Sequence, residues 1–195
     1  MYYLAYNKLF WGFVFVFIRI NIGNLDLLPN FIGYFLIYNG VNTLISQHRA
    51  FNNARVPALL MCILSIKDVY KARPQYFLDT SIITKNILWI FYDEIGFIIM
   101  FYIVFCVVRA IYLLAEEREL EELSKNAKNY WRAYFITASA SSIINPFLLN
   151  LSKDWKVLYF ILITIAFVTT LFIMGLMLMA RKELGNDRSG AEAEG

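Results

Sequence analysis

Long uncharged apolar runs alternate with short charged or polar stretches along the chain. A helix needs roughly 20 residues, with a range of about 17–25, to cross the hydrocarbon core of a bilayer. Six runs approach or reach this length, at about residues 4–22, 29–46, 56–70, 95–114, 131–150 and 155–180. The pattern predicts an all-α, polytopic integral membrane bundle with six transmembrane helices. Because the run at 56–70 is the weakest, five spans is the alternative.

The residues between these runs predict where the helices begin and end. Pro29 suits the first turn of the second helix, because its missing N–H would be unpaired there anyway. Residues 82–92 are rich in aromatics and are expected to form an interfacial segment before the fourth span. The segment 116–128 keeps helical spacing, so we expect the fourth helix to project beyond the membrane. Residues 1–184 then form a single transmembrane helical domain, and 185–195 a disordered polar tail.

Composition agrees with a membrane protein. Hydrophobic residues make up 59% of the chain and charged residues only 17%, against about 25% in typical soluble chains. A net charge of +3, without a basic stripe, argues against binding of nucleic acid. Cys62 and Cys106 both lie in apolar runs, where a cysteine behaves as a small buried hydrophobe. We therefore infer neither a disulfide nor a metal site.

The distribution of basic residues predicts the orientation. In the six-span topology, eleven of the eighteen Lys and Arg residues fall on one side of the membrane. Basic loops stay cytoplasmic, so both termini are predicted to be cytoplasmic. The richness in Ile, Phe, Tyr, Asn and Lys suggests an AT-rich bacterial genome. We therefore expect a multi-pass protein of a bacterial cytoplasmic membrane, surrounded by the lipid bilayer.

Signatures of common enzyme classes are missing from the sequence. The single histidine, His48, leaves no HExxH motif and no Ser-His-Asp triad, and it is expected to be a solvated loop residue. No GxSxG, P-loop or dinucleotide-binding fingerprint occurs. Asp26 and Asp68 do not lie in firmly apolar runs, which disfavours an intramembrane aspartyl pair. The sequence favours a non-enzymatic protein without cofactor or metal.

Ionisable residues near the predicted spans are the candidate site, because a charge at mid-membrane costs at least about 2.5–3.5 kcal/mol on insertion scales. Arg19 either snorkels to the outer interface or binds a carboxylate or an anionic ligand. Asp93 and Glu94 either lie at a helix N-terminus, whose dipole favours negative charge, or lie inside the membrane if the helix begins near Ile82. Eight polar residues fall toward the outer side and predict an outward-opening ligand pocket: Arg19, Asn21, Asn24, Asp26, Lys67, Asp68, Asp93 and Glu94.

Small residues predict close helix packing on two helices. Gly33 and Gly40 are two turns apart in the second span, which leaves one face of that helix nearly smooth. Ala138 and Ser142 belong to a cluster of small residues, ASASS, in the fifth span. Such faces let helix backbones approach within a membrane.

Two functions fit these features. The first is binding or transport of a small solute at the outer polar pocket, which we favour because intramembrane ionisable groups mark functional sites. The alternative is a regulatory, immunity or assembly subunit that acts through a membrane protein partner, with the helical extension at 116–128 as its docking element.

Overall fold

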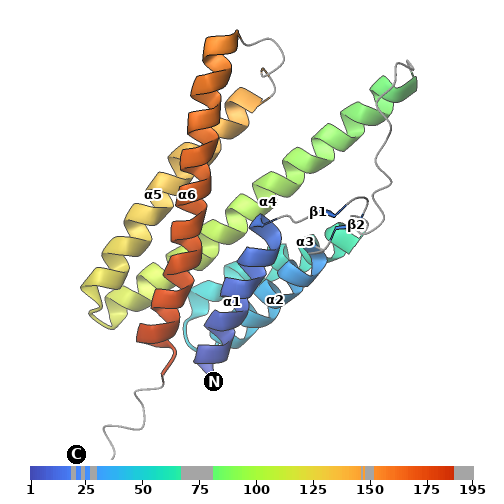
Figure 1. Ribbon diagram of the computed structural model, residues 1–195. Helices are drawn as coiled ribbons and strands as arrows, with labels where there is room; N and C mark the ends of the chain where they lie inside the picture. The colour runs from blue at the N-terminus through green and yellow to red at the C-terminus, as the bar shows by residue number, and fades with distance from the viewer. Residues whose placement is uncertain are drawn as a thin grey trace, which may run out of the picture. The chain divides into compact units, whose positions relative to one another are not determined.

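The fold is that of a computed structural model, shown in Figure 1. The structure describes residues 1–18, 21–22, 25–26, 30–66, 81–145, 147 and 152–186, and side chains at 1–18, 30–66, 94–145, 147, 152 and 154–186. It divides into two compact units. Trp11–Val107 form the central unit, whereas Met1–Phe10 and Val108–Gly195 form the terminal unit. Helices α1 and α4 contribute to both units.

The described residues form an all-α protein with six α-helices. They are α1 (Tyr2–Phe17), α2 (Asn30–Leu44), α3 (Asn52–Ser65), α4 (Ser81–Glu117), α5 (Glu121–Ile144) and α6 (Lys153–Leu184). A short 3-10 helix, η1 (Arg49–Phe51), precedes α3, and two-residue strands β1 (Asn21–Ile22) and β2 (Leu25–Asp26) pair antiparallel. The all-α class and the six helices predicted from the apolar runs are confirmed for the described part of the chain.

Among the described residues, two helical segments are long and apolar enough to cross a membrane, Glu94–Glu117 of α4 and Asp154–Leu184 of α6. Helix α3 has 14 residues and is therefore only about 21 Å long, less than the roughly 30 Å of a hydrocarbon core. Helix α5 has 24 residues, but charged side chains occupy its first half. Six crossings, and the alternative of five, remain predictions.

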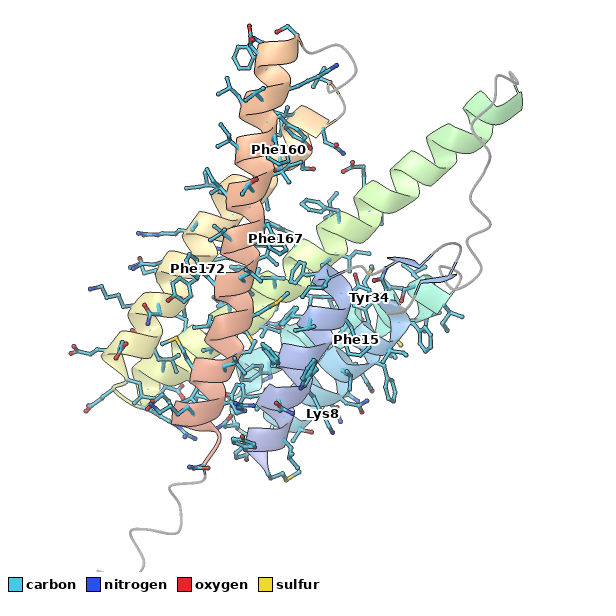
Figure 2. The ribbon with its side chains drawn as sticks, viewed as in Figure 1. Lys8, Phe15, Tyr34, Phe160, Phe167 and Phe172 are labelled. Carbon is cyan, nitrogen blue, oxygen red and sulfur yellow. The ribbon has the colours of Figure 1, made fainter. Side chains whose placement is uncertain are left out.

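In the central unit, α2 and α3 run antiparallel and side by side (Figure 1). Cys62 near the end of α3 donates from Sγ to the carbonyl oxygen of Phe31 at the start of α2, at 3.6 Å. Figure 2 shows Phe15 of α1 and the buried Tyr34 of α2 in this unit. Fully buried side chains hold it together, among them Phe13, Ile37, Val41, Leu44, Phe51, Ala54 and Ala58.

In the terminal unit, α5 and α6 pair along their lengths (Figure 1). Tyr130 of α5 stacks on Phe172 of α6 with ring centroids 5.1 Å apart. Apolar side chains from α1, α4, α5 and α6 supply the core, including Tyr6, Leu9, Ile111, Leu123, Ile173, Leu176 and Met177. The spacing of Ile173, Leu176 and Met177 places them on one stripe of α6, as expected for a helix that buries one face.

Two predicted helix ends are wrong, those of the first and the fourth helix. The first helix was expected to reach residue 22, but α1 ends at Phe17 and Asn21–Ile22 lie in β1. Asn and Gly in the segment at 21–24 favour turns over helix. Residues 82–92 are the first turns of α4, which is one helix of 37 residues from Ser81, and their interfacial location stays a prediction. An apolar segment rich in aromatic residues can form part of a helix, and it can also precede one.

The expected extension of the fourth helix through 116–128 is also wrong, because α4 ends at Glu117. The amide of Leu120 donates to the carbonyl of Ala115 at 2.8 Å, and that of Glu119 to the carbonyl of Glu116 at 3.1 Å. Glu119 has a φ of 56°, in the left-handed region. This pair of bonds around a left-handed residue is the Schellman ending of a helix. The rest of the segment forms the first two turns of α5.

Candidate functional site

Most of the predicted outer-side pocket lies outside the described side chains. Arg19, Asn24, Lys67 and Asp68 are not among the described residues. Asn21 and Asp26 are described in their backbone only, where they are Cα partners across the β1–β2 ladder. The ladder thus brings together two of the eight predicted ligand-binding residues. The pocket as a whole stays a prediction.

Asp93 and Glu94 lie well inside α4, since the helix begins at Ser81. Their placement at a helix N-terminus, one of the two alternatives, is therefore wrong, and the dipole of the first turn does not reach them. The Glu94 side chain is half-buried, and its neighbours Ile95 and Ile98 are apolar and exposed. Among the described residues Glu94 has no hydrogen-bond or ion-pair partner. It is a carboxylate within an apolar helix.

Helix α3 contacts α4 at Gly96, two residues after Glu94 and on the other side of the helix, since residues i and i+2 do not share a face. A Cβ added at Gly96 would lie 3.6 Å from the Cε of Met61, which is ordinary van der Waals contact. Met61 is buried, as is Ser65 one turn later on α3. The Ser65 hydroxyl donates to the carbonyl of Met61 at 2.6 Å, so its polar group is satisfied within the helix. Two polar groups of the central unit thus lack a described partner, the Glu94 carboxylate and the buried Oδ1 of Asn30 on α2.

Gly33, singled out for helix packing, meets a second glycine on α1. A Cβ at Gly33 would lie 2.9 Å from the carbonyl oxygen of Gly12, and a Cβ at Gly12 would lie 2.8 Å from the carbonyl oxygen of Gly33. A side chain at either position would collide with the backbone of the other helix. Gly12 was not singled out from the sequence, because it lies alone among aromatic residues. Gly40 is buried on the same helix as Gly33.

The small residues predicted on α5 lie near a buried polar contact. Ala138 is buried and Ser142 half-buried. Beside Ala138, the hydroxyls of Thr137 on α5 and Thr169 on α6 are 2.9 Å apart and hydrogen-bonded. Each threonine hydroxyl can instead donate to a carbonyl one turn earlier in its own helix. Sequence reasoning missed this pair, because single threonines in apolar runs give no signal of their partner.

An apolar groove of about 470 Å³ lies where the end of α5 faces the start of α6. The one described polar contact within it is weak, a bond of 3.3 Å from the Tyr159 hydroxyl to the side-chain oxygen of Asn145. The residues that line the groove are Ile143, Ile144, Phe147, Trp155, Leu158, Tyr159 and Leu162. This chemistry suits an apolar ligand surface and offers nothing to a metal.

His48 has a local structural role. Its Nδ1 accepts the amide of Ala50 at 3.1 Å, which caps the start of η1. In the described part of the chain, no group of three His, Cys, Asp or Glu side chains is arranged to hold a metal ion. Cys62 and Cys106 are free thiols.

No family model, curated protein or solved structure matches this chain.

Proposed function

We propose that the protein is a multi-pass integral membrane protein with both termini in the cytoplasm, located in a bacterial cytoplasmic membrane. The support comes from α6. Eleven large apolar side chains between Trp155 and Phe172 are 41–71% exposed. They occupy every side of the helix except the stripe of Tyr159, Leu162, Ala166 and Thr169, which is less exposed. Figure 2 labels three of the exposed side chains, Phe160, Phe167 and Phe172. A helix that is apolar all round suits the interior of a large protein or a bilayer.

The energetic cost of leaving this surface in water supports the membrane. Burial of one fully exposed large apolar side chain is worth roughly 1.5–3 kcal/mol. Eleven partly exposed ones therefore represent on the order of 10 kcal/mol, as much as the whole stability of a typical domain, about 5–15 kcal/mol. Lipid contact removes that cost.

The polar groups of this surface also suit lipid. Thr164 and Thr170 donate their hydroxyls to the carbonyls of Phe160 and Ala166, both at 2.9 Å. A hydroxyl bonded within its own helix needs no water, which is the condition that a hydrocarbon environment imposes.

Within the membrane, the proposed function is to bind or transport a small polar solute, without enzymatic chemistry. One observation carries this role, the position of Glu94. A half-buried carboxylate thirteen residues into an apolar helix, with no partner among the described residues, is costly unless it meets a ligand or a cation. Asp93 is adjacent, and Arg19 remains the predicted counter-charge. The solute is then expected to carry a group that a carboxylate recognises, a cation or a hydrogen-bond donor.

Native mass spectrometry of the detergent-purified full chain tests this role. Wild type should carry a bound small molecule, which Glu94→Gln and Arg19→Ala should lose. Glu122→Gln, at an exposed position on α5, removes the same charge elsewhere and should retain the ligand. A wild-type chain without a small molecule, or equal retention in Glu94→Gln and Glu122→Gln, would contradict solute binding at this carboxylate.

A second candidate is a subunit that acts through a membrane protein partner. The observation that favours it is the apolar groove between α5 and α6, which continues into the exposed surface of α6. A transmembrane helix of another protein fits such a surface by van der Waals packing. The same spectra distinguish the roles, because a second protein retained on a wild-type chain that lacks any small molecule would favour the subunit.

A further inference from the structure

The first turns of α1 and the end of α6 meet in the terminal unit. The amide of Tyr3 donates to the carbonyl oxygen of Gly185 at 3.1 Å. A Cβ at Gly185 would lie 3.0 Å from the Cα of Tyr3, so the two backbones are in close contact. Leu184 and Gly185 are both buried. This junction fixes the last turn of α6 against α1.

Arg181 is held in place at this junction. Its Nη1 donates to the side-chain oxygen of Asn7 at 2.8 Å, and its Cζ lies 4.9 Å from the centroid of the Tyr3 ring. The guanidinium is thus positioned by two side chains of another helix. It has five N–H donors, and Asn7 accepts the only hydrogen bond that it makes to the described residues. Fixed, unused donors of this kind are suited to an anion.

A cavity of about 340 Å³ opens beside this guanidinium, within the range of roughly 300–1,000 Å³ common for ligand pockets. Lys182 lines it as a second cation. The Lys182 side chain is 84% exposed, and its one ion pair to the described residues is distant, with Glu183 at 3.9 Å. Leu178 and the Tyr3 ring give the cavity an apolar side, and Asn186 adds a polar group to its lining.

Basic residues in the last turn of a helix have a simpler use, since they balance the negative end of the helix dipole. That use requires neither a second helix that orients the guanidinium nor a cavity between the cations. Both features are present here. Asn7 and Tyr3 of α1 orient the guanidinium, and the cavity is lined by Arg181 and Lys182. Two cations beside an apolar wall match a ligand with a charged head and an apolar body.

We propose that this cavity binds a phosphate group, and that its source is the headgroup of an anionic phospholipid. The phosphodiester accepts hydrogen bonds from Arg181 and is neutralised further by Lys182, while Leu178 and Tyr3 contact the start of the acyl region. Basic pockets at the cytoplasmic ends of membrane helices are suited to such headgroups. The phosphate chemistry stands on the geometry alone, whereas the lipid source rests on the proposed membrane placement. This site is separate from the carboxylate site at Glu94.

Native mass spectrometry with added ligands tests the proposal on the detergent-purified full chain. Wild type is titrated with phosphatidylglycerol, with zwitterionic phosphatidylcholine and with inorganic phosphate. We expect a clear preference for phosphatidylglycerol, weakened roughly fivefold by Arg181→Gln and by a similar factor by Lys182→Gln, since each basic residue near a membrane surface adds about 1 kcal/mol of attraction. Arg132→Gln removes an exposed charge of α5 and should leave the preference unchanged.

Arg181→Lys separates a shaped site from general charge. Lysine keeps the charge but not the planar fork or its stacking on Tyr3, so this variant should also bind the anionic lipid more weakly than wild type. Lys182→Gln guards against misfolding, because Lys182 lies outside the junction that holds α1 to α6. Equal loss in Arg132→Gln and Arg181→Gln, or no lipid preference in wild type, would overturn the proposal.

Inorganic phosphate identifies the source. If it binds as well as phosphatidylglycerol and depends on Arg181, the phosphate site stands and the lipid source is overturned. Membrane placement is tested separately by resistance of the protein to alkaline extraction from membranes. Extraction at high pH would contradict the placement and leave the Arg181 phosphate result unaffected.

Discussion

The two halves of α6 have similar apolar composition and opposite surroundings. Residues 173–184 bury a continuous stripe, with Ile173, Leu176, Met177, Ala180 and Leu184 almost wholly inaccessible. Residues 154–168 leave nearly every side chain exposed, including Phe160 and Phe167 (Figure 2). Hydrophobicity alone therefore does not distinguish a helix that packs on its neighbours from one that faces a different medium. The second half is held by protein, and the first half has the exposed apolar surface that we assign to lipid.

Truncation of isoleucine should separate the two halves most strongly. Ile173→Ala removes a fully buried side chain and should lower the free energy of unfolding by roughly 2–5 kcal/mol, from lost burial and the cavity left behind. Ile161→Ala makes the same change where the side chain is 49% exposed. Its effect should be well below half as large. Equilibrium unfolding in detergent measures both, and equal losses would contradict the comparison.

A charge in the exposed half should be almost as damaging. Ile165→Lys places an ammonium on a surface that we assign to lipid, at a cost of about 2.5–3.5 kcal/mol on insertion scales. The fraction of chain recovered in the membrane should fall accordingly. On a surface that faces water, the same substitution would change stability by only about 0.5 kcal/mol. Normal recovery of Ile165→Lys would therefore place this half of α6 in water.

The turn between α4 and α5 offers a smaller, stabilising change. Glu119 adopts the left-handed conformation at the helix end, which costs a residue with a Cβ roughly 1–2 kcal/mol. Glu119→Gly should raise the free energy of unfolding by about 1 kcal/mol. Glu117→Gly, inside the last turn of α4, should instead destabilise. A rise in both variants, or a fall in both, would contradict the Schellman ending.

The hydroxyl pair between α5 and α6 should contribute least. A double-mutant cycle of Thr137→Val and Thr169→Val measures the coupling between the two side chains, which averages about 0.6 kcal/mol for such pairs in membrane proteins. Each threonine also bonds to its own helix, so neither single variant leaves a large penalty. Coupling of zero would show that this hydroxyl pair contributes nothing to the association of the two helices.

The apolar runs predicted the helices well but not their ends. An apolar run identifies residues that are kept away from water. Such residues can be buried inside a helix or just beyond its end, so the run does not show where the helix stops. The end of α4 depends on the backbone conformation of Glu119, a residue with no turn preference. The start of α4 at Ser81 depends on a segment whose aromatic residues suit either a helix or an interface. The pattern of apolar residues therefore carries little information about where these helix ends lie.

The candidate sites were partly visible in the sequence. Asp93 and Glu94 stood out as charges in an apolar run, but their place inside the helix depended on where α4 begins. The contact of Arg181 with Asn7 and Tyr3 could not be predicted, because it joins the two ends of the chain. Gly33 was identified as a packing residue, whereas its partner Gly12 required the register of α1 against α2. Distant pairings follow from the fold and not from local pattern.

The most direct test of the central claim is the water accessibility of the exposed half of α6 in native membranes. Ile163→Cys is placed in a chain whose two native thiols, Cys62 and Cys106, are replaced by alanine. Lys182→Cys in the same background is the control for a solvent-exposed position. A water-soluble maleimide should label Lys182→Cys in opened membranes and leave Ile163→Cys unlabelled until the membrane is dissolved. Labelling of Ile163→Cys as fast as Lys182→Cys in intact bilayers would contradict the membrane assignment.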